Sequence, residues 1–215
     1  MILEFVGAGD AFGSGGRLQA CLSVRWAGHH VLVDCGATSL VGLKRLGLEP
    51  AGVEAVLVSH LHGDHFGGLP FLILDQQFAR RERPLIVGGP IGTAARLEQA
   101  LEVLFPGSSR IQRRFRVDVV EQQPHVATDV GPARVTTVSV DHASGAPALG
   151  YESSVVHARS PTRATRPGRP FCSTWLPRPT SSSARRMRSI GRSATTWTTP
   201  RSVPIAHSCA AGGWC

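Results

Sequence analysis

The stretch from Val58 to Gly68 is the most informative part of the sequence, because four side chains that commonly bind metal lie close together in it: His60, His62, Asp64 and His65. The apolar run at residues 53–58 comes directly before them and predicts a buried strand. The four side chains therefore belong to the loop that leaves this strand. Imidazole nitrogens and carboxylate oxygens are suitable zinc ligands, and the strand-to-loop context favours a metal site over a polar turn that is merely rich in histidine.

The spacing within this loop predicts two groups of ligands. His60 and His62 can point at one ion while Asp64 and His65 turn toward a second, because Gly63 relaxes the backbone between the pairs. A hydrolytic site also needs a coordination position that stays open for water. The loop alone does not provide enough protein ligands for two complete sites, so further ligands have to come from elsewhere in the chain.

The pattern His-x-His-x-Asp-His after a hydrophobic strand, followed by Phe66-Gly67-Gly68-Leu69-Pro70, resembles the metallo-β-lactamase superfamily and more closely its ribonuclease Z-like phosphodiesterase branch. The resemblance covers residues 1–152. It implies an α/β fold, the αββα sandwich, which is incomplete here in its C-terminal half. It also implies a site for two zinc ions, with Asp64 as both metal ligand and catalytic proton acceptor. The pattern is specific for the superfamily and much less specific for the substrate.

The same resemblance assigns three residues outside the histidine-rich loop. His142 follows a predicted strand at residues 134–140 and precedes a Gly150-Tyr151 strand, so it matches the third ligand of the first zinc. Asp10, in a glycine-rich loop, and Asp34, at the end of the next strand pair, match carboxylates at the edge of the site that hold loops or metal-bound histidines in place.

Apolar periodicity predicts the remaining elements. A first strand covers residues 2–7, and a strand pair follows with a turn that leaves His29 and His30 exposed. Helices are expected at residues 40–47, 69–83 and 93–105, the second of them ending in solvated arginines. Four arginines further on either contact a phosphate backbone or lie on the wet face of an edge strand: Arg110, Arg113, Arg114 and Arg116.

Charge is distributed unevenly along the 215 residues. Residues 1–155 carry 13 Lys and Arg against 15 Asp and Glu, whereas residues 156–215 carry 10 Arg and no acidic residue. The net charge of +8 is thus a property of the tail. It gives no reason to expect that residues 1–155 bind nucleic acid. The five cysteines show no disulfide spacing, and neither a signal peptide nor a membrane-spanning run is evident. A cytoplasmic protein without membrane contact is expected.

The tail has the composition of a GC-rich gene read in a wrong frame. Of the 56 residues from Ser160 to Cys215, 33 are Ser, Thr, Pro or Arg, yet tryptophans and cysteines are scattered among them, which is unusual for a disordered tail. Codons that encode residues 159–199 can be chosen so that another reading frame translates to a different sequence. That sequence predicts a strand ending in Ser-Gly-Asp-Thr, then an amphipathic helix, then a buried strand. This resembles the continuation of the superfamily, in which that aspartate bridges both metals and a later histidine completes the second site.

We therefore expect a frameshift between Glu152 and Arg159, in the gene or in its recorded sequence. Two parts result: a metallo-β-lactamase-like portion, residues 1–155, and an aberrant, out-of-frame and disordered tail, residues 156–215. Without the bridging aspartate and the final histidine, at most one zinc ion is well ligated. An impaired enzyme follows from this.

The resemblance implies a zinc-dependent hydrolase, a phosphodiesterase like ribonuclease Z that acts on the 3′ ends of tRNA precursors and forms a homodimer in its intact family form. One alternative is hydrolysis of a cyclic nucleotide or another small ester on the same fold. The other is nucleic-acid binding without catalysis through the basic tail, although any arginine-rich peptide binds nucleic acid to some degree.

Overall fold

A computed structural model describes residues 1–152 and 170–171, and its centre is a six-stranded sheet in which the order of the strands follows the chain. The strands are β1 (Ile2–Gly7), β2 (Cys21–Trp26), β3 (His29–Val33), β4 (Ala55–Leu57), β5 (Leu85–Pro90) and β6 (Val117–Gln122). The first three pair antiparallel, β1 and β2 across the loop of residues 8–20 and β2 and β3 across a tight turn, and β3 to β6 pair in parallel. Parallel neighbours require crossover connections, which the helices provide.

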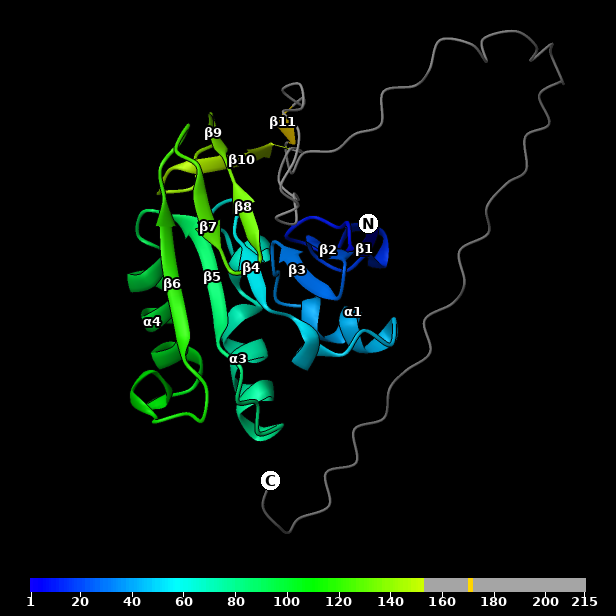
Figure 1. Cartoon of the computed structure of the whole chain (residues 1–215), viewed down its shortest axis with the longest axis vertical. Coiled ribbons are helices and arrows are strands. Elements are labelled where there is room, and N and C mark those ends of the chain that lie inside the picture. The colour runs from blue at the N-terminus through cyan, green and yellow to red at the C-terminus, as the bar shows by residue number, and fades with distance from the viewer. Residues whose placement is uncertain (153–169, 172–215) are drawn as a thin grey trace, which may run out of the picture. The chain divides into compact units, whose positions relative to one another are not determined.

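Helices cover one face of this sheet (Figure 1). They are α1 (Ser39–Arg45), the short α2 (Gly63–Phe66), α3 (Leu69–Phe78) and α4 (Thr93–Leu104), with 3-10 turns η1 (Ser14–Gly16), η2 (Pro50–Gly52) and η3 (Ser108–Arg110). Leu97 and Leu101, one turn apart on α4, are buried in the same apolar cluster as Leu32 of β3 and Val87 of β5. This cluster fixes the helices on the sheet.

Two small sheets lie against the other face of the six-stranded sheet. One is the hairpin of β7 (Thr128–Val130) and β8 (Ala133–Val135), and the other contains β9 (Thr137–Val140), β10 (Ala148–Glu152) and β11 (Pro170–Phe171). Val130, Val135 and Tyr151 form a second apolar cluster with Val31 and Leu57. Helices, large sheet and small sheets are the successive layers of the predicted α/β sandwich.

Three local predictions are wrong. The expected strand at residues 134–140 is two strands, β8 and β9, that belong to different sheets. The helix expected at residues 69–83 ends at Phe78, and Arg80 has a φ of 56°, which a helix cannot continue. His30 is buried rather than exposed in a turn, and its Nε2 lies 3.0 Å from the Ser23 hydroxyl.

Arg81, which the sequence placed at a solvated helix end, is a buried side chain with 6% exposure. Its guanidinium donates hydrogen bonds to four backbone carbonyls, those of Ala51, Val53, Arg83 and Pro84, at 2.6–3.3 Å. It also lies 5.7 Å from the centre of the Phe115 ring. Arg81 thus ties the turn before β4 to the turn before β5.

We expect the substitution Arg81→Met to lower the free energy of unfolding by about 3 kcal/mol, because buried carbonyls that lose their donors carry the full cost of desolvation. Urea denaturation followed by circular dichroism would measure it. Arg83→Met is the matched control, since the Arg83 side chain is exposed; its effect should stay within about 0.5 kcal/mol. Equal stability of the two variants would contradict the role assigned to Arg81.

No helix among the described residues is long and apolar enough to cross a membrane. The predicted frameshift between residues 152 and 159 lies outside the described residues, and so does the predicted tail at residues 156–215 apart from β11.

Candidate metal centre

The histidine-rich loop begins where β4 ends, at the carboxyl ends of the parallel strands. The Val58 amide donates to the Gly88 carbonyl of β5 at 2.7 Å, which keeps the chain beside the sheet for one more residue. The Leu149 amide of β10 donates to the Ser59 carbonyl at 2.8 Å. The start of the loop is therefore held from both sheets, and His60 is buried there.

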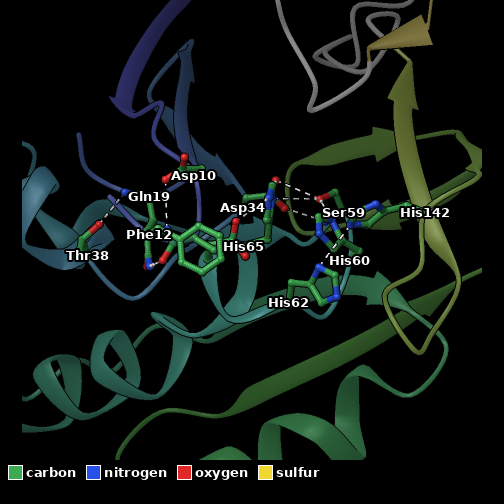
Figure 2. A network of polar contacts seen from close by, with 12 residues as sticks. Asp10, Phe12, Gln19, Asp34, Thr38, Ser59, His60, His62, His65 and His142 are labelled. Carbon is green, nitrogen blue, oxygen red and sulfur yellow. Dashed lines mark hydrogen bonds and ion pairs between the residues drawn. The ribbon is translucent and has the colours of Figure 1, made fainter. Parts of the chain in front are cut away.

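Three histidines converge at this point, as predicted from the sequence. The ligand nitrogens of His60, His62 and His142 all lie within 4.8 Å of one another, and His62 Nδ1 is 3.2 Å from His142 Nε2. His62 directly precedes α2, whereas His142 comes from the loop after β9, on a different sheet (Figure 2). The structure thus brings together residues that are 80 positions apart.

The environment of His60 suits a metal ligand. Burial and the nearby His65 lower the pKa of His60 to about 4, so the imidazole is neutral at physiological pH. Its Nδ1 lies 2.9 Å from the Ser59 hydroxyl, which leaves Nε2 free to face the other two histidines. Three imidazoles around a common point, with room for water as a fourth ligand, match the donor set of catalytic zinc.

Asp34 orients this loop from the end of β3. Its Oδ1 accepts a hydrogen bond from the Ser59 amide at 2.7 Å, and its Oδ2 accepts from the Ser59 hydroxyl at 3.0 Å and from His65 Nδ1 at 2.7 Å. Asp34 has a φ of 60°, a left-handed conformation that a non-glycine residue adopts at some cost. The hydrogen bonds offset that cost and give Asp34 the bracing position predicted for it.

Asp64 and His65 form the second predicted group. Both belong to α2, and His65 Nε2 lies 3.4 Å from Asp64 Oδ2. Burial lowers the pKa of His65, but the hydrogen bond and the negative charge of Asp34 outweigh it, so the pKa is raised overall. Within residues 1–152, the structure places these two side chains beside the three-histidine cluster, with the rings of His60 and His65 4.0 Å apart.

Two glycines allow the end of β3 to approach the metal loop. A Cβ atom on Gly36 would lie 2.2 Å from the Asp64 carbonyl oxygen, and one on Gly68 would lie 2.2 Å from the Gly36 carbonyl oxygen. Any side chain at either position would therefore push α2 away from Asp34. The Asp-x-Gly and Gly-Gly pairs in the sequence are the local signature of this contact.

The Asp10 carboxylate braces the loop in which it lies. Its carboxylate accepts hydrogen bonds from the amides of Phe12 at 3.1 Å and Ser14 at 3.0 Å, and these bonds, foremost those from Ser14, lower its pKa. Within residues 1–152, Asp10 forms no hydrogen bond or ion pair with a histidine. Of the two roles that the sequence left open for Asp10, loop bracing is the one that the hydrogen bonds support.

A cavity of about 550 Å³ opens over both groups of ligands, and the predicted site residues line it: Asp10, Asp34, His60, His62, Asp64, His65 and His142. Sequence reasoning missed two residues that support it. One is Ser59, which precedes the first histidine directly. The other is Tyr151, whose hydroxyl lies 3.0 Å from the Val58 carbonyl oxygen and 2.8 Å from Gln122 Oε1 and so fixes β10 on the loop.

We expect Asp34→Asn to weaken zinc binding by about 10- to 100-fold, because an amide cannot accept the hydrogen bonds of both Ser59 and His65 as a carboxylate does. Asparagine is chosen since it tolerates the left-handed backbone. Competition with a chromogenic chelator would give the dissociation constant. Asp75→Asn, which changes an aspartate bonded, within residues 1–152, only to Lys44 and Gln76 through its side chain, is the control; unchanged zinc affinity in Asp34→Asn would show that the carboxylate does not orient the ligands.

A family model described as anti-Pycsar protein Apyc1 matches residues 1–158. Ribonuclease Z of Geobacillus kaustophilus is 30% identical over 154 residues, which are 70% of this chain and 48% of that protein. Ribonuclease Z of Shouchella clausii is 38% identical over 136 residues, 56% of this chain and 44% of that protein. The chain thus spans about half the length of the curated relatives it matches.

Solved structures show the same fold. Human tRNase Z, short form, superposes with a TM-score of 0.59 at 25% identity and covers 73% of this chain and 65% of its own. The metallo-β-lactamase fold protein YhfI from Bacillus subtilis gives a TM-score of 0.54 at 20% identity, with 70% and 56% covered, and supports the fold alone. Together with the family match over residues 1–158, these likenesses show that the chain belongs to the metallo-β-lactamase superfamily and, within it, to the family of the anti-Pycsar protein Apyc1.

Proposed function

We propose that this chain derives from a metal-dependent phosphodiesterase that hydrolyses cyclic nucleotides. The observation that carries the proposal is the family match over residues 1–158, since the name of that family points to the cyclic nucleotides of Pycsar signalling. The match includes all of the predicted ligands, from His60 to His142. The small-substrate alternative drawn from the sequence is therefore preferred to the tRNA substrate.

The cavity suits a small phosphodiester. Its volume of about 550 Å³ falls within the range of about 300–1,000 Å³ that is usual for small-molecule sites. His60, His62 and His142, which would hold a zinc ion, line the cavity together with Asp64. The groups that would act on a phosphodiester thus line the same cavity, which would also accommodate the rest of a small substrate.

A zinc ion bound there would supply Lewis-acid chemistry, lowering the pKa of water to about 7 and stabilising negative charge on a phosphoryl oxygen. The residues of the chain have the remaining tasks. Asp64 would accept the proton of the attacking water, and Asp34 would hold His65 in one orientation through its hydrogen bond at 2.7 Å. Within residues 1–152, Asp64 and His65 are the candidates for the second metal, so we propose that this group binds its metal weakly.

A tRNA precursor is the second candidate substrate. Two observations favour it. The relatives named above are called ribonuclease Z, and human tRNase Z superposes on 73% of this chain. Binding of nucleic acid through residues 156–215 remains a third hypothesis, and those residues lie outside the described part of the chain apart from β11.

Side-by-side turnover of the two substrate classes tests the proposal. The zinc-loaded chain would be given 3′,5′-cyclic mononucleotides in one assay and a precursor tRNA with a 3′ trailer in the other. We expect hydrolysis of the cyclic nucleotides, with a low kcat, and no cleavage at the tRNA 3′ end. Cleavage of the precursor without hydrolysis of any cyclic nucleotide would assign the chain to the ribonuclease Z activity instead.

A further inference from the structure

The glycine-rich loop between β1 and β2 lines part of the cavity and carries an exposed aromatic ring. Phe12 is 92% exposed, although its neighbours Asp10 and Ala11 line the cavity. Phe5, on β1, is 57% exposed and lines the cavity wall. Apolar and aromatic side chains therefore lie next to Asp10 on this side of the cavity, whereas the candidate metal ligands that line it are histidines and a carboxylate.

The loop that carries Phe12 is fixed at several points (Figure 2). Asp10 accepts the Phe12 amide at 3.1 Å, and the Gln19 side-chain amide donates to the Ala11 carbonyl at 3.2 Å. Gln19 is held in turn, because its backbone amide donates to the Thr38 hydroxyl at 2.8 Å. The Ala11 carbonyl and the Phe12 amide are thus both held by side chains, and the exposed Phe12 ring projects from a braced backbone.

A cyclic nucleotide placed with its phosphodiester at the histidines would direct its base toward the apolar side chains next to Asp10. The base is the apolar, planar end of such a substrate, and every base offers a π-face to an aromatic side chain. Phe12 provides such a face beside the cavity and has no packing role in the described fold, because it is almost fully exposed.

We propose that Phe12 determines specificity for nucleotides by stacking on the base of the substrate. This inference rests on the proposed function and deepens it. Stacking tolerates all bases, so Phe12 favours nucleotides over phosphodiesters without a base and discriminates little among the bases. Larger purine rings gain more contact with the phenyl ring than pyrimidines do.

The test uses the full-length, zinc-loaded chain and three variants. Phe12→Ala removes the ring, Phe12→Trp keeps an aromatic face, and Phe78→Ala removes an 80% exposed ring at the end of α3 that is not part of the cavity lining. The probes are a slowly hydrolysed phosphorothioate of cyclic AMP and 1-O-methylribose 3′,5′-cyclic phosphate, which has the ring phosphodiester but no base. Titration calorimetry gives the dissociation constants, and steady-state kinetics gives KM and kcat.

We expect Phe12→Ala to weaken binding of the nucleotide by about tenfold or more and to raise KM for cyclic AMP by the same factor, with kcat unchanged. Binding of the base-free probe should not change. Phe12→Trp should restore nucleotide binding, and Phe78→Ala should behave as the wild type. A 2-aminopurine cyclic nucleotide should lose fluorescence on binding to the wild type but not to Phe12→Ala, since stacking quenches this base.

Two kinds of failure are distinguishable. If the wild type binds and hydrolyses cyclic nucleotides and Phe12→Ala does so equally well, the stacking role is overturned while the proposed function stands. If the wild type binds neither probe, the proposed function fails and the stacking role fails with it. Equal loss of both probes in Phe12→Ala, or a change in its oligomeric state by sedimentation, would assign Phe12 to structure or assembly and also overturn the inference.

Discussion

Replacing His142 by alanine is expected to lower the zinc affinity of the chain by about 10²–10³-fold and to lower any phosphodiesterase activity by at least about 10²-fold. Zinc sites with four protein ligands gain about 10–16 kcal/mol, so each ligand accounts for about 2.5–4 kcal/mol. His142 is one of three converging imidazoles and the only one of them that comes from the loop after β9. Its removal leaves His60 and His62 as a two-ligand site.

Truncating His142 should leave the fold intact, because its side chain is exposed. The matched control is His125→Asn, which removes an exposed histidine from another loop and keeps a residue that tolerates the φ of 64° found there. Zinc per chain would be measured by atomic absorption after dialysis against a weak chelator. If His142→Ala retained as much zinc as His125→Asn, the three-histidine site would be refuted.

Restoring the other reading frame after residue 152 is expected to have the second large effect. A chain of residues 1–152 followed by the alternative translation should bind about two zinc ions instead of about one and should gain at least about 10²-fold in kcat/KM. The physical reason is that the Ser-Gly-Asp-Thr aspartate and a later histidine would join Asp64 and His65. We propose this frame because the family match ends at residue 158, within a few residues of the point where the composition changes.

The control for this prediction is the same restored chain with the Ser-Gly-Asp-Thr aspartate replaced by asparagine. It should return to about one zinc ion per chain while keeping the added stability of the restored fold. Sequencing of the genomic DNA from codon 145 through the stop codon decides whether the frame change lies in the gene or in the record. A restored chain that is no more active than the 215-residue chain would refute the frameshift as the cause of impairment.

The sequence was sufficient to predict a group of ligands at the centre of the site because the signal there is local. His60, His62, Asp64 and His65 lie together on one loop after one buried strand, so periodicity and ligand chemistry were sufficient. His142 was identified only through the family resemblance, since no local pattern relates residues that are 80 positions apart.

Tertiary contacts, which a window of sequence does not show, explain why some predictions were wrong. Arg81 follows a helix and has the polarity of a surface residue, but it binds the carbonyls of Ala51 and Val53, which are 30 and 28 residues away and cannot be seen in a window of sequence. The strand predicted at residues 134–140 has continuous β propensity, and only the packing of two sheets divides it at Thr136. The role of Ser59 was missed for the same reason, because its partner Asp34 is 25 residues away.

The hydrogen bonds of Asp34 also link the two groups of metal ligands. The same carboxylate binds Ser59, the neighbour of His60, and His65, the partner of Asp64. An ion held by the three histidines would therefore order, through Ser59 and Asp34, the imidazole that a second ion requires. The first ion to bind bears the entropic cost of that ordering, so its binding to one ligand group should increase the affinity of the other group for a second ion. By thermodynamic linkage the increase is reciprocal.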